Sequence, residues 1–164
     1  TTASTSLKNN LRNYINQYRM IGDTVNIKDA FVVNISINFE IITLPNYNNN
    51  QVLTNCVTSL QNFFEINKWQ INQPILLRDI STLLDNITGV QTVTNITVSN
   101  NAGTQSGYSQ YAYDVSGALQ NGTIFPSIDP MIFEVKYPNT DIVGRVVSLG
   151  QGGGSTANGG GRNY

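Results

Sequence analysis

Residues 25–41 alternate between apolar and polar side chains almost without a break. Apolar residues hold one parity and polar residues the other: Val25, Ile27, Phe31, Val33, Ile35, Ile37, Phe39 and Ile41 against Asn26, Lys28, Asn34, Ser36, Asn38 and Glu40. Because successive strand side chains point to opposite faces, this pattern predicts a long strand, or two collinear strands, with one buried and one solvated face. The strand is expected to end at Leu44-Pro45, since proline cannot continue a central ladder.

Apolar residues at helical spacing predict three helices. The first covers residues 7–20, with Ser6 as its N-cap and a stop near Gly22-Asp23. The second follows a loop at 46–50 and has the clearest stripe, which comprises Val52, Leu53, Cys56, Val57, Leu60, Phe63 and Phe64. The third stripe comprises Leu77, Ile80, Leu83, Leu84 and Ile87, with Gly89 as the C-terminal stop. Cys56 lies within its stripe without basic neighbours, which favours a small core hydrophobe over a reactive thiol.

The remaining segments are predicted to be extended. Residues 66–75 form a short extended stretch around Trp69, and residues 90–98 a strand whose alternation slips once, as at a bulge. A polar loop at 99–107 follows. The next part has hairpin signals: alternation at 111–115, the two-residue turn Asn121-Gly122, a turn between Pro126 and Pro130, and a reversal at 138–141 that joins a strand at 133–137 to residues 142–149.

This order of elements predicts an α+β fold. We expect a mixed sheet with two helices packed on one face, followed by a β-hairpin-rich C-terminal part and a disordered Gly-rich tail. The predicted divisions are a linker and lead-in helix at 1–22, one α+β domain at 23–149, and the tail at 150–164. The start of the chain has neither an initiator Met nor a secretory hydrophobic region, so we expect that it begins inside a longer protein.

Composition argues against catalysis. The 164 residues include no histidine and one cysteine, which removes the commonest general base and any Cys/His metal cluster. The ten carboxylates are scattered singly, and Asx hydrogen bonds in turns explain Asp23, Asp129 and Asp141. The glycines from Gly150 onward have no lysine or helix after them, as a phosphate loop requires. We therefore expect no enzyme activity, no metal and no cofactor.

Charge narrows the class of partner. Charged residues make up 12% of the chain and the net charge is −1, so no basic footprint for nucleic acid is visible. No apolar run approaches the ~20 residues that cross a bilayer, so we expect no membrane partner. Polarity comes from Asn, Gln, Ser and Thr, which suits a protein embedded in an assembly. An AT-rich genome, which favours Asn and Ile codons, explains the same composition equally well.

One aromatic cluster suggests an alternative function. Tyr108, Tyr111 and Tyr113 lie beside a loop rich in Ser, Gly and Gln, a composition that sugar-binding and protein-binding surfaces share. A half-buried hairpin face is the simpler interpretation. A receptor- or carbohydrate-binding adhesion module is the alternative that this cluster leaves open.

Four stretches in order resemble a known family. They are Gln17-Tyr18-Arg19-Met20 with Asp23 and residues 25–29; Phe63-Phe64 through residues 68–75; residues 87–93 around Gly89-Val90-Gln91-Thr92-Val93; and residues 133–142 with Gly144-Arg145. Together they resemble the C-terminal portion of the J-like baseplate wedge subunit of T-even-type contractile-tailed bacteriophages. The resemblance covers residues 11–147, and the Gly-rich terminus matches no part of it.

The resemblance implies a structural protein of the virion tail baseplate, assembled in the host cytoplasm. Such a subunit associates with itself, in our expectation as a dimer, and with other wedge proteins that form a ring around the tail hub. This ring rearranges when the sheath contracts. We expect interface residues at Tyr18, Arg19, Met20, Tyr137 and Arg145, because Arg and Tyr are enriched at interface hot spots and Met adapts to irregular surfaces. Arg19→Ala is expected to weaken assembly without unfolding the domain. Closure of the core by Tyr18 and Met20 is the alternative.

Overall fold

The computed structural model describes residues 3–20, 22, 24–127 and 130–148, and it has the α+β architecture expected from the sequence. The predicted Gly-rich tail and the turn roles of Asp23 and Asp129 lie outside these residues. The helices are α1 (Thr5–Asn16), α2 (Asn49–Phe63), α3 (Leu77–Asp85) and the single turns α4 (Val115–Ala118) and α5 (Pro138–Asp141). The strands are β1 (Phe31–Thr43), β2 (Ile75–Leu76), β3 (Val90–Asn101), β4 (Leu119–Gln120), β5 (Thr123–Ile124), β6 (Met131–Glu134) and β7 (Ile142–Val146).

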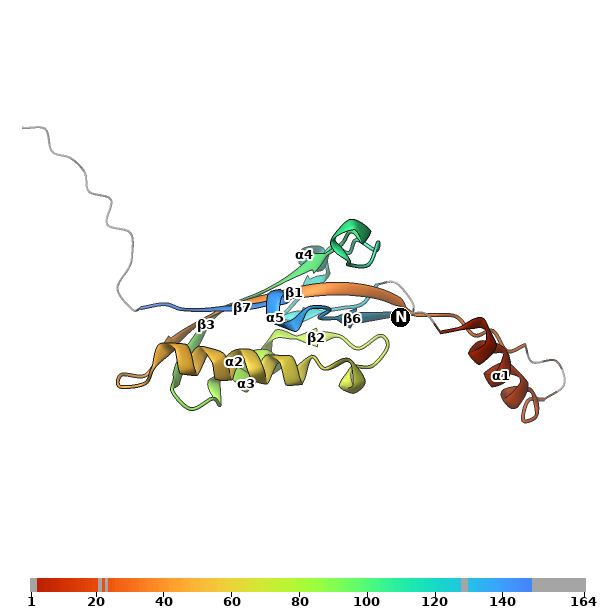
Figure 1. Cartoon of the computed structure of the whole chain (residues 1–164), viewed down its shortest axis with the longest axis horizontal. Helices are drawn as coiled ribbons and strands as arrows, with labels where there is room; N and C mark the ends of the chain where they lie inside the picture. Colours follow the sequence, from red (N-terminus) through yellow and green to blue (C-terminus); the bar gives the residue numbers. More distant parts are fainter. Residues whose placement is uncertain (1–2, 21, 23, 128–129, 149–164) are drawn as a thin grey trace, which may run out of the picture.

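Strand β1 is the centre of the main sheet (Figure 1). β3 pairs with one side of it in antiparallel register, from Asn34 opposite Asn101 to Thr43 opposite Val90. On the other side β6 and then β7 both run parallel to β1, with Phe31 opposite Met131 and Ile37 opposite Ile142. β6 and β7 therefore occupy one edge in succession, and α5 interrupts them.

The predicted reversal at 138–141 is therefore wrong. Pro138 opens a single helical turn, where its fixed φ and missing N–H are tolerated, and the chain then continues in its original direction. The Asp141 carboxyl accepts the backbone N–H of Tyr137 at 2.8 Å, which closes the turn. A hydrogen bond from a backbone N–H to a nearby Asp carboxyl is common in reversing turns. Here it stabilises the single helical turn that separates β6 from β7 along one edge of the sheet.

The core lies between one face of β1 and helices α2 and α3, which cover the same side of the sheet (Figure 1). The odd-numbered residues of β1, from Val33 to Ile41, are at most 1% exposed. Opposite them α2 contributes Val52, Cys56 and Leu60, and α3 contributes Ile80 and Leu84. The predicted packing of two helices on one face is confirmed, as is the core position of Cys56.

The ladder of β1 begins later than its alternating pattern. Val25 and Ile27 are half-buried while Asn26 and Lys28 are exposed, so the alternation continues upstream, but strand pairing among the described residues starts at Phe31. Alternation reports which face is sheltered and does not require a hydrogen-bonded neighbour.

The first helix also differs from its prediction: Ser4, not Ser6, accepts the N–H of Leu7 as N-cap, and the helix ends at Asn16.

Two turn predictions are confirmed around the third helix and the first hairpin. Gly89 has a φ of +96°, and a Cβ there would overlap Val52 and Tyr47, so only glycine fits this stop. Asn121 and Gly122 have φ values of 50° and 76°, which is the two-residue turn of a hairpin, here between β4 and β5. The predicted bulge in residues 90–98 is also present, because the register of β3 against β1 shifts between Val93 and Asn95.

Three local predictions are wrong. Residues 66–75 contain a 3-10 turn at Ile66–Lys68 and only end in a strand, and the predicted polar loop begins with the last part of β3, followed by a 3-10 turn at Thr104–Ser106. Residues 111–114 join no ladder, and Val115 begins α4, for which Asp114 is the N-cap. Phe31 packs edge-on against Tyr111 with ring centroids 4.8 Å apart, so tertiary packing positions this segment without a strand partner.

Candidate interaction surface

α1 lies on an arm that projects from the end of the sheet (Figure 1). The helix contains no buried residue. Its base is fixed at Asp29, whose carboxyl accepts the Ala3 N–H at 3.2 Å and forms an ion pair with Lys8. The hydrogen bond from Lys8 lowers the pKa of Asp29 below its ordinary value. The arm is therefore attached to the root of β1 by polar contacts, while its apolar side chains stay outside the core.

One side of this helix carries an apolar stripe in contact with solvent. Leu7, Leu11 and Tyr14 follow the i, i+4, i+7 spacing and are 58%, 45% and 60% exposed. We call these three residues the α1 stripe. An amphipathic helix usually buries such a stripe, because about 25 cal/mol is gained per Å² of apolar surface removed from water. An apolar face left open in one copy is typical of a surface that binds another protein.

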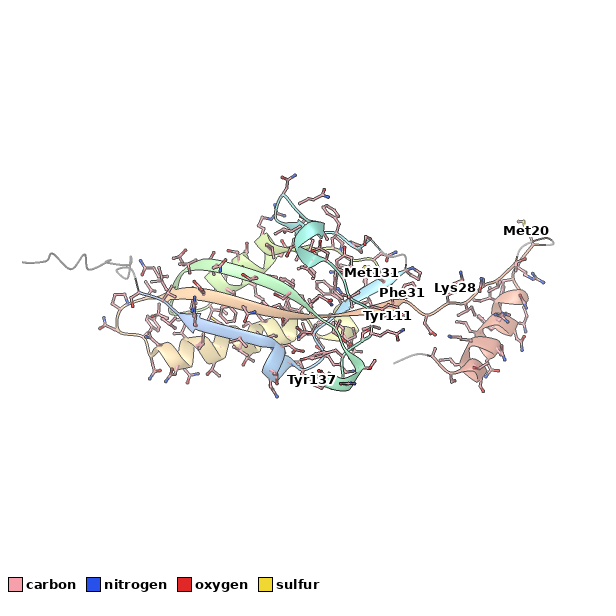
Figure 2. All side chains as sticks on the ribbon, turned by 90° about the horizontal axis from the view of Figure 1, so that it is seen from above. Met20, Lys28, Phe31, Tyr111, Met131 and Tyr137 are labelled. Carbon is pink, nitrogen blue, oxygen red and sulfur yellow. The ribbon has the colours of Figure 1, made fainter. Side chains whose placement is uncertain are left out.

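The predicted residues Tyr18, Arg19 and Met20 lie on the same arm, beyond the end of α1. Tyr18 packs its ring against Tyr14 with centroids 5.3 Å apart, and both Tyr18 and Met20 are largely exposed. The alternative in which Tyr18 and Met20 close the core is therefore wrong. Figure 2 shows Met20 at the outer end of the arm, far from Tyr137 on the body.

The other two predicted residues lie on the body and are engaged within the fold. The Tyr137 ring packs edge-on against Tyr108 at 5.3 Å between centroids. Arg145 on β7 lies beside Glu40 on β1, and its Nε donates to the Glu40 carboxyl at 2.9 Å. The structure thus groups three of the five predicted residues on the arm and separates Tyr137 and Arg145 from them. The interface role of all five remains a prediction.

A second apolar surface lies at the base of the arm. A groove of about 260 Å³ is lined by Val32 on β1, by its register partner Ile132 on β6, and by Ile66 and Ile71 from the segment between α2 and β2. Ile66 is 43% exposed and Ile71 57% exposed. The remaining lining is Ala30 with the carboxylates of Asp29 and Glu134. We call this the isoleucine groove, after Ile66, Ile71 and Ile132.

A cluster of buried polar side chains lies around Asn34 and Asp141. Asp141 is 2% exposed and accepts hydrogen bonds from the Tyr108 hydroxyl at 2.6 Å and from Asn101 at 3.2 Å, besides the Tyr137 N–H. The bond to Asp141 raises the pKa of Tyr108 above its ordinary value. Asn34, also buried, donates to Glu134 at 2.7 Å. Asp141, Tyr108 and Asn101 thus bind one another, and Asn34 binds Glu134. These polar groups have a structural use within the fold.

The tyrosines behind the adhesion alternative are bound within the fold. Tyr113 is buried, packs edge-on against Phe133 at 5.7 Å and donates its hydroxyl to the Phe125 carbonyl. Tyr111 packs on Phe31, and Tyr108 bonds to Asp141. The three residues are half-buried or buried, as the simpler interpretation expects, although no hairpin carries them.

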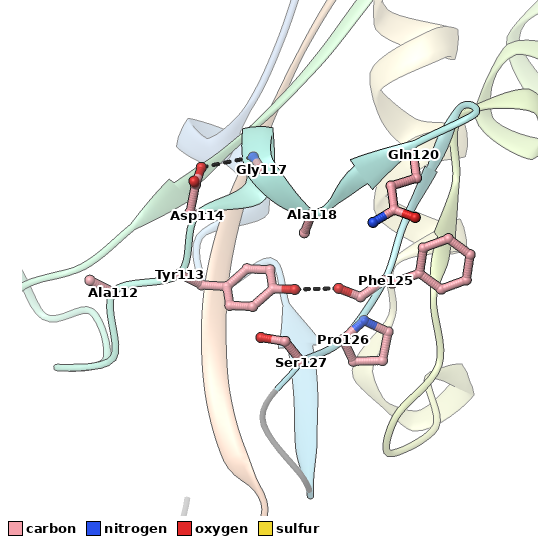
Figure 3. A pocket seen from close by; sticks show the side chains of 9 residues that line it. All are labelled: Ala112, Tyr113, Asp114, Gly117, Ala118, Gln120, Phe125, Pro126 and Ser127. Atoms are coloured by element: carbon pink, nitrogen blue, oxygen red, sulfur yellow. Dashed lines mark hydrogen bonds between the residues drawn. The ribbon is translucent and has the colours of Figure 1, made fainter.

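A cavity with an open volume of about 570 Å³ lies beside Tyr113 (Figure 3). Among the described residues that line it, the charged one is Asp114, which accepts the Gly117 N–H at 2.9 Å as the cap of α4. The Tyr113 side chain points across the cavity to the Phe125 backbone, while the Phe125 ring points away (Figure 3). The Tyr113 hydroxyl and the Asp114 carboxyl are thus used by the fold. In the described part of the chain, no three His, Cys, Asp or Glu side chains gather where a metal ion would bind, and no helix is long and apolar enough to cross a bilayer.

Cys56 allows a direct test of the core. Its side chain is fully buried under α2, and burial raises the pKa of the thiol to about 11. Since the thiolate is the reactive form, we expect less than about one thiol in a thousand to be ionised at pH 7.5. Incubation with a thiol-reactive dye should leave the folded protein unlabelled and label it fully in denaturant. Rapid labelling of the native protein would contradict the buried position.

Comparison with known proteins adds no assignment, because neither family models nor curated protein sequences match this chain. The functional interpretation therefore depends on the four stretches quoted above and on the surface itself. Sequence reasoning identified the helical spacing of the α1 stripe but did not place it in solvent, and it missed the isoleucine groove. A spacing pattern has no signal for either, since exposed and buried isoleucines look alike in a sequence.

Proposed function

We propose that this protein is a structural component of a phage tail baseplate wedge, which associates with itself and with other wedge proteins to build the ring around the tail hub. The observation that carries the proposal is the α1 stripe, an apolar helix face on an arm that the body of the same chain leaves uncovered. The arm residues 17–20 and the groove residue Ile71 both belong to the stretches that resemble the wedge subunit.

The low charge of the chain supports the same function. A net charge of −1 gives two copies little mutual repulsion, and exposed apolar residues then favour association. The adhesion alternative has no comparable support, because its three tyrosines are taken up by internal contacts. Binding of the whole chain on a glycan array would favour that alternative.

The proposal predicts that the stripe drives association. Replacing Leu7 and Leu11 together with lysine should raise the dissociation constant of the self-associated form by about 100-fold or more, because each buried leucine is worth about 1.5–3 kcal/mol. Light scattering after size-exclusion chromatography, over a wide concentration range, measures this change. The melting temperature should stay the same, since both residues are exposed and lysine is a good helix former.

Val143→Lys provides the matched control. Val143 is an exposed apolar residue on β7, away from the arm, and its replacement should leave the dissociation constant unchanged. A wild-type protein that stays monomeric at every concentration would contradict self-association through this chain. If Val143→Lys raised the dissociation constant equally, the added positive charge, and not the loss of the α1 stripe, would explain the effect.

A further inference from the structure

We propose that the α1 stripe of one copy binds the isoleucine groove of a second copy, so that two chains exchange their arms. This inference rests on the proposed function, because it names the surface that self-association uses. Both surfaces are apolar and both lie open in a single chain: the stripe is about half exposed, and so are Ile66 and Ile71 in the groove.

Charge selects the helix as the occupant of the groove. The charged side chains of α1 are Lys8 and Arg12, and the helix contains no acidic residue. The charged side chains that line the groove are Asp29 and Glu134, both carboxylates. Lys8 and Arg12 each follow a stripe residue by one position, so they flank the apolar contact on the helix surface. Lys8 is already paired with Asp29 of its own chain, and Asn34 donates to one oxygen of Glu134. A helix seated in the groove would therefore bring Arg12 toward the other oxygen of Glu134 at its edge.

The position of the arm explains why a chain leaves its own groove open. Asp29 lines the groove and also binds Ala3 and Lys8, so the first turn of α1 is held at the rim of the groove. From there the arm runs outward, past Lys28 and away from Phe31 and Met131 at the end of the sheet (Figure 2). Beyond its attachment at Asp29, the arm is thus directed away from the body of its own chain.

Exchange between two copies satisfies both surfaces at once. In a twofold dimer each chain donates one helix and receives one, so the same contact forms twice and the assembly is closed. The stripe spans eight residues, or seven rises of about 1.5 Å, which is about 10 Å along the helix axis. This is a short, local contact that the four apolar side chains Val32, Ile66, Ile71 and Ile132 can cover. The described residues that line the groove include none from β3, which lies at the opposite edge of the main sheet.

Disulfide cross-linking between two variants of the full chain, each with one added cysteine, tests the exchange. Leu11→Cys places a thiol on the stripe, and Ile71→Cys places one in the groove, while native Cys56 is buried. One variant carries an affinity tag of different mass, so that mixed dimers are recognised. We expect the mixed Leu11→Cys and Ile71→Cys disulfide to form at least tenfold faster than a disulfide between Leu11→Cys and the control Val143→Cys.

The outcomes separate this inference from the proposed function. A dimer in light scattering whose dominant disulfide joins Leu11→Cys to Leu11→Cys would overturn arm exchange in favour of helix pairing, and would leave self-association standing. A dimer that forms no disulfide between the stripe and the groove would likewise overturn the exchange alone. A strictly monomeric wild-type protein would overturn both.

Discussion

Replacing Asp141 with alanine should lower the free energy of unfolding by about 3–5 kcal/mol. The carboxyl group is 2% exposed and accepts three hydrogen bonds, from Tyr108, Asn101 and the Tyr137 N–H. Each buried donor left without an acceptor costs about 1–3 kcal/mol, and the three costs are not fully additive because the groups form one cluster. A chain of this size loses about 2–4 °C of melting temperature per kcal/mol, so we expect a fall of roughly 10 °C.

Two further variants distinguish this cluster from a simple loss of volume. Asp141→Asn keeps the shape but turns one acceptor into a donor, so it should lose most of the same stability. Asp79→Ala removes a carboxyl that is half exposed and 3.8 Å from Arg78, and it should change the melting temperature by less than 2 °C, as expected for an exposed ion pair. If Asp141→Ala melts like the wild type, the cluster does not hold β3 and α5 to the sheet.

Phe39→Ala should have a similar effect, about 3–5 kcal/mol, for a different reason. Its ring is 1% exposed in the middle of β1, and truncation of a buried phenylalanine loses its transfer energy and leaves a cavity. The ring lies over Gly144 on the neighbouring strand β7, where a Cβ would overlap it. Urea unfolding, with the slope compared between variants, measures the change in stability.

Gly144→Ala makes this contact testable as a pair. In the wild type the added methyl group should clash with the Phe39 ring and cost about 1–3 kcal/mol. In the Phe39→Ala background the same substitution should cost less, because the methyl group then enters the cavity. Equal costs in both backgrounds would show that the ring does not depend on the glycine. Val143→Ala, at the exposed neighbouring position, is the control.

The elements that the sequence predicts well are those with a local cause. The parity of Val33 to Ile41 identified the core face of β1, because burial on one side forces a period of two. The stripe of α2 and the positive φ required at Gly122 are likewise set by neighbours in the chain. These residues would behave in the same way in many folds, which is why pattern reasoning finds them.

The parallel edge of the sheet has no such local cause. Phe133 and its neighbours alternate as any half-buried strand does, and the pattern does not say that the partner is Val33 and runs parallel to it. Pro138-Asn139-Thr140-Asp141 suits a reversing turn and a single helical turn equally well. The choice between them is made by Tyr108 and Asn101, which hold Asp141 from distant parts of the chain.

The candidate interface divides in the same way. The helical spacing of Leu7, Leu11 and Tyr14 could be predicted from the sequence, because the spacing depends on the helix alone. Their exposure depends on where the arm leaves the body, which the Asp29 contacts decide. Ile66 and Ile71 were predicted only as parts of an extended stretch around Trp69, and the 3-10 turn that contains Ile66 was not expected.

Strand β1 pairs with strands that are synthesised long after it, and this has a consequence for folding during translation. Ile37 pairs with Ile142, and 142 − 37 = 105 residues must follow it before that edge of the sheet can form. At about 5–20 residues per second, the ribosome needs about 5–20 s to deliver them. For that time the central strand of the main sheet has an open side, and chaperone binding to the nascent chain should be strongest in this window. Yield in the cell should therefore depend on translation speed across the second half of the message.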